Sequence, residues 1–168
     1  MIVSIIYLII SFFLENFMSI IFPSTLSSIS FFTTIYTVIG LVILYPYFSN
    51  HKKYYLLVII FGILFDILYT STFILNLIIF LIVSFVIKIL YDILSENVFM
   101  TNLISVVAII LYHLLSFVIL SIFGSINYDF MLLINIILHS ILMTIIYTSI
   151  SYFVIKFIYS RLNIKQIK

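Results

Sequence analysis

Long apolar runs separated by short polar breaks dominate this 168-residue chain. A helix needs about 20 mainly apolar residues to cross the hydrocarbon core of a bilayer, and six runs approach or exceed that length. The predicted spans are residues 2–22, 26–48, 54–70, 73–91, 98–123 and 130–159. The pattern therefore predicts an all-α polytopic membrane protein, in which residues 1–168 form a single integral membrane domain.

The break between the third and fourth runs is the mildest, because Tyr69-Thr70-Ser71-Thr72 carries no charge. Two alternatives to a pair of separate spans are therefore open at this point. The segment could form a re-entrant hairpin, or it could form a single bent helix.

The positions of the basic residues favour six separate spans. Lys and Arg in short loops remain on the cytoplasmic side of a membrane. With six spans and a cytoplasmic N-terminus, all of the basic residues fall at cytoplasmic positions. They are Lys52, Lys53, Lys88, Lys156, Arg161, Lys165 and Lys168. The prediction is a six-helix bundle with both ends in the cytoplasm.

Composition supports lipid as the solvent, since 66% of the residues are apolar and only 7% are charged. Soluble domains carry about 25% charged residues. The chain has no cysteine, which excludes disulfides and thiolate metal sites. It also has no basic stripe that would bind nucleic acid. The low content of charged residues makes membrane lipid the expected environment.

Ionisable and amide side chains within the spans are the candidate site, because such groups are costly in hydrocarbon. They are Glu15, Asp66, Asn76, His113 and His139. A rise of about 1.5 Å per residue places the four ionisable groups in the outer half of the bilayer. They could line one outward-facing cavity. The favoured interpretation is that these groups satisfy one another and fix helix register, and the alternative is a partner-binding or ligand-binding cavity.

Two predicted spans carry stripes of small hydroxyl residues at three- and four-residue steps. The stripes are Ser27, Ser30, Thr34 and Thr37 in the second span, and Ser140, Thr144, Thr148 and Ser151 in the sixth. Small residues allow close helix contact within a membrane. We expect them to pack inside the bundle; the alternative is contact with another membrane protein.

Motifs for catalysis are missing from the sequence. It contains no phosphate-binding glycine loop, no G-x-S-x-G elbow, no paired D-x-x-D aspartates and no H-E-x-x-H metal motif. We therefore predict no enzymatic activity, no cofactor and no metal. The weakest alternative is an intramembrane enzyme acting on lipid-linked sugars or peptides, with His113 and His139 as its acid–base pair.

Several short motifs between residues 10 and 95 occur in a recognisable order. Leu14-Glu15-Asn16 lies late in the first span, and Pro23 precedes the second. Gly62 and Asp66 end the third span as Gly-x-x-x-Asp, and Asn76 lies near the start of the fourth. In this order the motifs resemble the bacterial rod shape-determining protein MreD family.

The chain departs from the family pattern at two positions. The family has a Gly-x-Asn at the fourth motif, where this chain has Ile74-Leu75-Asn76. It usually has an acidic residue after the proline, where this chain has Ser24. The two last spans resemble the family only in length and character.

The resemblance implies a non-enzymatic, multi-pass scaffold in the bacterial inner membrane. It would belong to the cell-elongation machinery, which builds peptidoglycan and controls cell shape. Its implied partners are the single-pass protein MreC and, through it, the actin-like MreB filament and the peptidoglycan synthases. The family fold is similar to that of the substrate-binding subunit of energy-coupling-factor transporters. The alternative function is therefore a small-molecule (vitamin)-binding membrane subunit of such a transporter. Against it, the chain has no Ala-x-x-x-Ala docking motif and a single alanine, Ala108.

Overall fold

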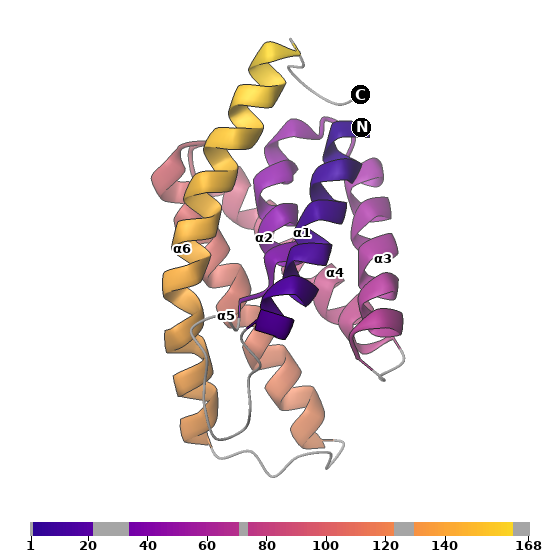
Figure 1. Ribbon diagram of the computed structural model, residues 1–168, viewed down its shortest axis with the longest axis vertical. Coiled ribbons are helices and arrows are strands. Elements are labelled where there is room, and N and C mark those ends of the chain that lie inside the picture. Colours follow the sequence, from indigo (N-terminus) through magenta and orange to yellow (C-terminus); the bar gives the residue numbers. More distant parts are fainter. Residues whose placement is uncertain (1, 22–33, 71–73, 123–129, 163–168) are drawn as a thin grey trace.

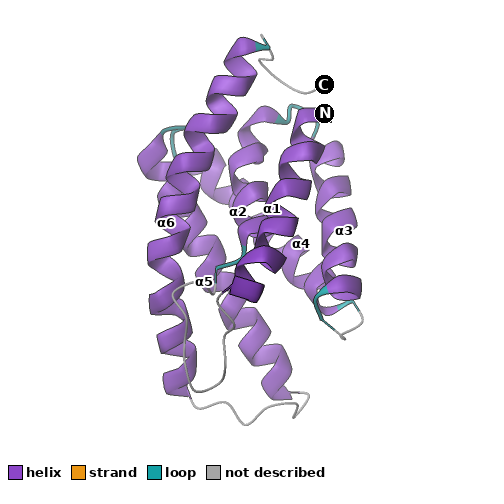
Figure 2. Cartoon of the chain, viewed as in Figure 1, coloured by secondary structure: helices purple, strands orange, loops and turns teal. Residues whose placement is uncertain are grey.

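A computed structural model describes residues 2–21, 34–70, 74–122 and 130–162 (Figure 1). The described residues form helices joined by turns and contain no β-strand element (Figure 2). The prediction of an all-α protein is confirmed. Pro23, Ser24, Ser27 and Ser30 lie outside the described residues.

The helix bounds follow the apolar runs closely except in the second run. The elements are α1 (Ile2–Ile21), α2 (Tyr36–Leu44), the 3-10 helix η1 (Tyr45–Tyr47), α3 (His51–Leu68), α4 (Leu75–Ile93), α5 (Val98–Ile122) and α6 (Phe130–Arg161). Helix α3 begins three residues before the predicted third span. The cause is Asn50, whose side-chain oxygen accepts a hydrogen bond from the Lys52 backbone N–H at 3.0 Å and caps the helix.

The prediction of one continuous helix over residues 26–48 is wrong. Thr34 and Ile35 are not helical, and Ile35 has an extended backbone immediately before α2. The α-helix then gives way to η1 at Tyr45, next to Pro46. The apolar run correctly indicates that most of the described residues here are buried, but it does not indicate how long the helix is. An apolar segment can also be buried as extended chain among other helices.

Helix α2 lies at the centre of the bundle. All nine of its residues are buried. It packs against α1, α4, α5 and α6. Such a short helix is stabilised mainly by tertiary packing, because isolated helices of fewer than about 12 residues are marginal.

The mild polar break between the third and fourth apolar runs interrupts the helix. Helix α3 ends at Leu68, α4 begins at Leu75, and the two helices pack extensively against each other. A single bent helix is therefore excluded. The two helices form a hairpin, in which the end of α3 and the start of α4 point away from the end of the molecule where α1 begins and α6 ends (Figure 1).

Three helical segments of the described chain are long and apolar enough to cross a membrane. They are Leu75–Ile93, Val98–Ile122 and Leu133–Arg161. Helix α3 has similar length but carries Lys52, Lys53 and Asp66. The apolar parts of α1 and α2 in the described chain are shorter. Length and composition thus suit a membrane protein.

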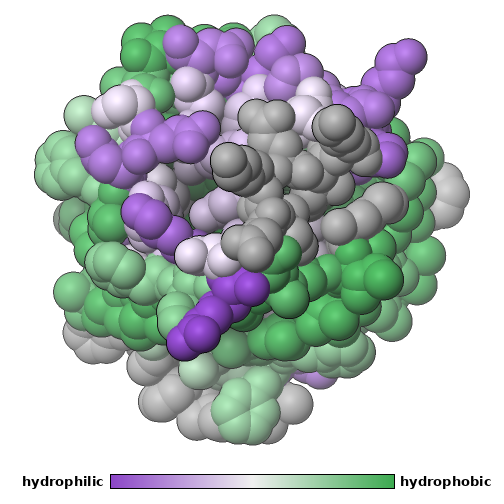
Figure 3. Space-filling view, turned by 90° about the horizontal axis from the view of Figure 1, so that it is seen from above, coloured by the Kyte–Doolittle hydropathy of each residue, from purple (hydrophilic) through white to green (hydrophobic). Residues whose placement is uncertain are grey.

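Charged groups gather at one end of the bundle. The start of α3, the end of α4 and the end of α6 lie toward the same end as the start of α1 (Figure 1). Hydrophilic residues cover much of that end when it is viewed directly (Figure 3). The described basic residues belong to these helix ends, and they are Lys52, Lys53, Lys88, Lys156 and Arg161.

The hydroxyl stripe of the sixth predicted span faces the interior. Ser140, Thr144 and Thr148 are completely buried, and Ser151 is nearly so. The Thr144 hydroxyl is 2.6 Å from the hydroxyl of Thr34, which joins α6 to the residues before α2. The predicted role in packing the bundle is confirmed for these residues.

Candidate functional site: a polar cluster at the start of α4

Asp66 connects the end of α3 to the start of α4. One carboxylate oxygen accepts hydrogen bonds from the backbone N–H of Asn76 at 2.9 Å and from its side-chain amide at 3.0 Å. The other oxygen accepts from the Leu77 backbone N–H at 3.0 Å. These backbone groups belong to the first turn of α4, where N–H groups have no partner within the helix. Asp66 therefore acts as the N-cap of a neighbouring helix, and its negative charge suits the positive end of the helix dipole.

Asn76 extends this cap into a network that spans three helices. Its amide N–H donates to the Thr70 hydroxyl at 2.9 Å, while its carbonyl oxygen accepts from the Tyr112 hydroxyl at 2.7 Å. The Asn76 side chain is 1% exposed, so each of these polar groups has to find its partner inside the protein. We call Asp66, Thr70, Asn76 and Tyr112 the Asp66 cluster.

Gly62 brings the two helices close enough for the cap to form. A β-carbon at this position would lie 2.9 Å from the backbone α-carbon of Leu77, closer than two carbon atoms can pack. Gly62 lies one turn before Asp66, so both residues present the same face of α3 to the first turn of α4. The Gly-x-x-x-Asp motif is therefore a helix-contact and capping device.

Ile74 adopts a backbone conformation that normally belongs to glycine. Its φ angle is +69°, and it is the one non-glycine residue with positive φ in the described chain. A β-branched residue is strained in this region, because its side chain approaches the backbone. Ile74 stands where the MreD pattern has glycine. The turn before α4 thus has a backbone conformation that glycine would adopt without strain.

Replacing Ile74 with glycine is expected to raise the free energy of unfolding by about 1 kcal/mol. The substitution removes the side chain that is strained at positive φ and leaves the Asp66 cap in place. The measurement is thermal unfolding of the purified protein in detergent.

Ile78→Gly, one turn further into α4, is the matched control for the Ile74 substitution. Ile78 is about half exposed and lies inside the helix, where glycine costs about 1 kcal/mol relative to alanine. Equal destabilisation by both substitutions would contradict the strained conformation at Ile74.

Glu15 has a different partner from the Asp66 cluster. Its carboxylate accepts a hydrogen bond from the Thr37 hydroxyl at 3.1 Å, which joins α1 to α2. The Glu15 side chain is half-buried, and the neighbouring Asn16 and Phe17 are exposed. Glu15 is therefore the acidic motif residue that retains some access to the surroundings of the bundle.

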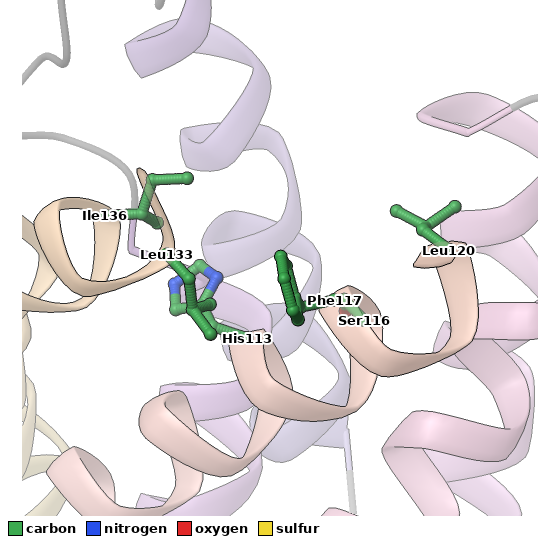
Figure 4. A pocket seen from close by; sticks show the side chains of 6 residues that line it. All are labelled: His113, Ser116, Phe117, Leu120, Leu133 and Ile136. Carbon is green, nitrogen blue, oxygen red and sulfur yellow. The ribbon is translucent and has the colours of Figure 1, made fainter. Parts of the chain in front are cut away.

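The two histidines lie on α5 and α6. His113 lines a mainly apolar pocket of about 130 Å³ between these helices, together with Ser116, Phe117, Leu133 and other residues. Figure 4 shows the side chains contributed by each helix. The Nδ1 atom of His139 is 2.7 Å from the carbonyl oxygen of Asn135, four residues earlier in α6. This contact is local to one helix and holds the imidazole against its own backbone.

The structure joins only part of the predicted site. Asp66 and Asn76 are in direct contact, as the interpretation of mutual satisfaction expects. Glu15, His113 and His139 are placed against other groups. Among the described residues, no group of three or more His, Asp or Glu could hold a metal ion. The polar groups of the Asp66 cluster hydrogen-bond to one another and to the start of α4. This arrangement is suited to fixing the positions of the helices.

Sequence reasoning missed Thr70 and Tyr112 as members of the cluster. Thr70 lies four residues after Asp66, a spacing that places two residues on one helix face and that could have suggested the contact. Tyr112 lies 36 residues from Asn76 and gives no comparable signal.

No protein-family model, curated protein or solved structure matches this chain.

Proposed function

We propose that this protein is a non-enzymatic membrane scaffold of the bacterial cell-elongation machinery, of the MreD type. The observation that carries the proposal is the backbone of Ile74. It has the conformation that favours glycine at the position where the MreD pattern has glycine. Residues other than glycine adopt this conformation uncommonly, so its occurrence at this position supports the resemblance.

The contacts around this turn support the same proposal. Gly62, Asp66 and Asn76 are motif residues, and they meet at one point although the motif is spread over two helices. Their polar groups are engaged with one another and with the start of α4. In this proposal the motif builds a rigid α3–α4 hairpin, and the protein acts by packing against partners instead of by reacting with a substrate.

The proposed arrangement has six spans in the bacterial inner membrane with both ends in the cytoplasm. The start of α1, the end of α6 and the described basic residues lie toward one end of the bundle, which supports this arrangement (Figure 1). The non-helical residues before α2 are compatible with a membrane, because α2 and Thr34 are buried in protein. The proposed direct partner is a single-pass MreC-like protein. MreB and the peptidoglycan synthases would be reached through it.

Glu15 provides the test, because it is the accessible acidic residue of the motif. In a strain whose own copy is replaced by tagged protein, Glu15→Gln is expected to reduce co-purification of the MreC-like protein at least fivefold and to convert rods to round cells. The amide oxygen of glutamine can still accept from Thr37, so thermal unfolding in detergent should change little. The substitution thus replaces the carboxyl group with an amide of the same size and retains the internal contact.

Thr37→Val is the matched control, since it removes the internal hydrogen bond and leaves the Glu15 carboxyl group in place. It should retain both the partner and the rod shape. Full co-purification and normal shape in the Glu15→Gln strain would remove Glu15 from the mechanism. If complete loss of the protein also left cell shape and wall synthesis unchanged, the proposed function would be refuted.

A further inference from the structure

A second pocket lies at the end of the bundle where the basic residues gather. It has a volume of about 140 Å³ and is formed by η1, the α4–α5 connection and α6. Its lining includes three aromatic side chains, Tyr47, Tyr91 and Tyr152, and two charged ones, Glu96 and Lys156. The Asp66 cluster lies near the opposite end, at the α3–α4 turn, so this pocket is separate from the proposed motif site.

The pocket presents one charge of each sign. The Lys156 ammonium lies 5.4 Å from the centre of the Tyr152 ring, on the same helix, and this ring contact supports its side chain. Glu96 lies on the short connection between α4 and α5. Both charged side chains are exposed, while the tyrosines are half-buried and form the walls. A ligand that carries both a cation and an anion would match this arrangement.

The volume of the pocket and its position near helix ends limit the kind of ligand that it could bind. The pocket has a volume of about 140 Å³. Drug-sized ligands need about 300 Å³ or more. Tyrosine and lysine side chains near helix ends mark the interface between lipid and water, where phospholipid headgroups lie.

We propose that this pocket binds the headgroup of a zwitterionic phospholipid of the phosphoethanolamine class. The lipid phosphate would pair with Lys156, and its primary ammonium would pair with Glu96 against the tyrosine walls. A primary ammonium has three N–H donors for the Glu96 carboxylate and the tyrosine oxygens, which a quaternary ammonium lacks. The acyl chains would remain in the surrounding bilayer. This inference does not depend on the proposed scaffold function.

Native mass spectrometry of the whole protein in detergent tests the proposal. Three lipids with identical acyl chains are titrated separately, with phosphoethanolamine, phosphocholine and phosphoglycerol headgroups. The phosphoethanolamine lipid is expected to bind at least fivefold more tightly than the other two. Glu96→Gln and Lys156→Gln should each weaken its binding about tenfold, the effect typical of losing a charged hydrogen bond.

Matched controls separate this pocket from general attraction to charge. Asp92→Asn and Lys52→Gln remove one charge of each sign at the same end of the bundle, from residues that do not line the pocket, and should leave binding unchanged. Glu96→Lys should shift the preference to the phosphoglycerol lipid, because it makes the pocket wholly basic. Free phosphoethanolamine, added as a competitor, should displace the lipid only at much higher concentration, because it lacks the acyl chains that also pack against the apolar surface of the protein. Equal binding of the three lipids, or unchanged binding in both pocket variants, would overturn the proposal.

Discussion

Asp66→Ala is expected to lower the free energy of unfolding by about 3–5 kcal/mol. The alanine leaves the backbone N–H groups of Asn76 and Leu77 without their acceptors, and the Asn76 amide loses a partner as well. These groups are largely buried, so water can replace the lost oxygens only by opening the helix contact. Thermal unfolding in detergent, with circular dichroism to follow helix content, measures the effect.

Asp66→Asn is the control for this prediction, because it retains one oxygen of nearly the same position. That oxygen can still accept from Asn76, whereas the amide nitrogen opposes the Leu77 N–H. We expect a smaller loss, of about 1–2 kcal/mol. An alanine variant as stable as the unmodified protein would show that Asp66 does not cap α4. The large structural effect also means that Asp66→Ala alone is a poor test of partner binding, since lost association would follow from lost structure.

Gly62→Ala is expected to lower the free energy of unfolding by about 2 kcal/mol. The new methyl group would meet the α-carbon of Leu77 at 2.9 Å, and a backbone atom can move away only if the whole first turn of α4 moves. That movement would also lengthen the hydrogen bonds to Asp66. The same unfolding measurement applies, and amide hydrogen exchange at the start of α4 should become faster.

Gly40→Ala is the matched glycine control within α2. A methyl group there would meet the end of the Leu8 side chain at 3.0 Å and the Ser11 hydroxyl at 3.2 Å. Side chains can adjust by rotation, and alanine is intrinsically better in a helix than glycine. The expected change is therefore less than about 1 kcal/mol. If the two substitutions had equal effects, the close contact at Gly62 would not be specific to the α3–α4 hairpin.

Three of the residues that carry the resemblance to MreD, Gly62, Asp66 and Asn76, have a shared physical role in the structure. Gly62 permits the close approach of two helices, Asp66 caps the second helix, and Asn76 receives the cap. The departure at Ile74 is the most informative position. Sequence propensity argues against a left-handed isoleucine, and the turn forms nevertheless because the surrounding contacts determine it.

The helical class, most helix ends and the gathering of the basic residues at one end of the bundle could be predicted from the order of apolar and polar residues. The reason is that an apolar solvent leaves the backbone few alternatives to helix, so run length and polar breaks carry most of the information. At Thr34 and Ile35 this reasoning failed, because burial among neighbouring helices also satisfies an apolar segment.

Which polar residues are in contact could be seen only in the tertiary structure. The meeting of Tyr112 with Asn76, and of Glu15 with Thr37, depends on how each helix is rotated about its axis and which neighbour it packs against. Side-chain packing over the entire bundle sets those rotations. Spacing within a single helix does not encode them, which is why the predicted polar residues divide among several environments instead of lining one cavity.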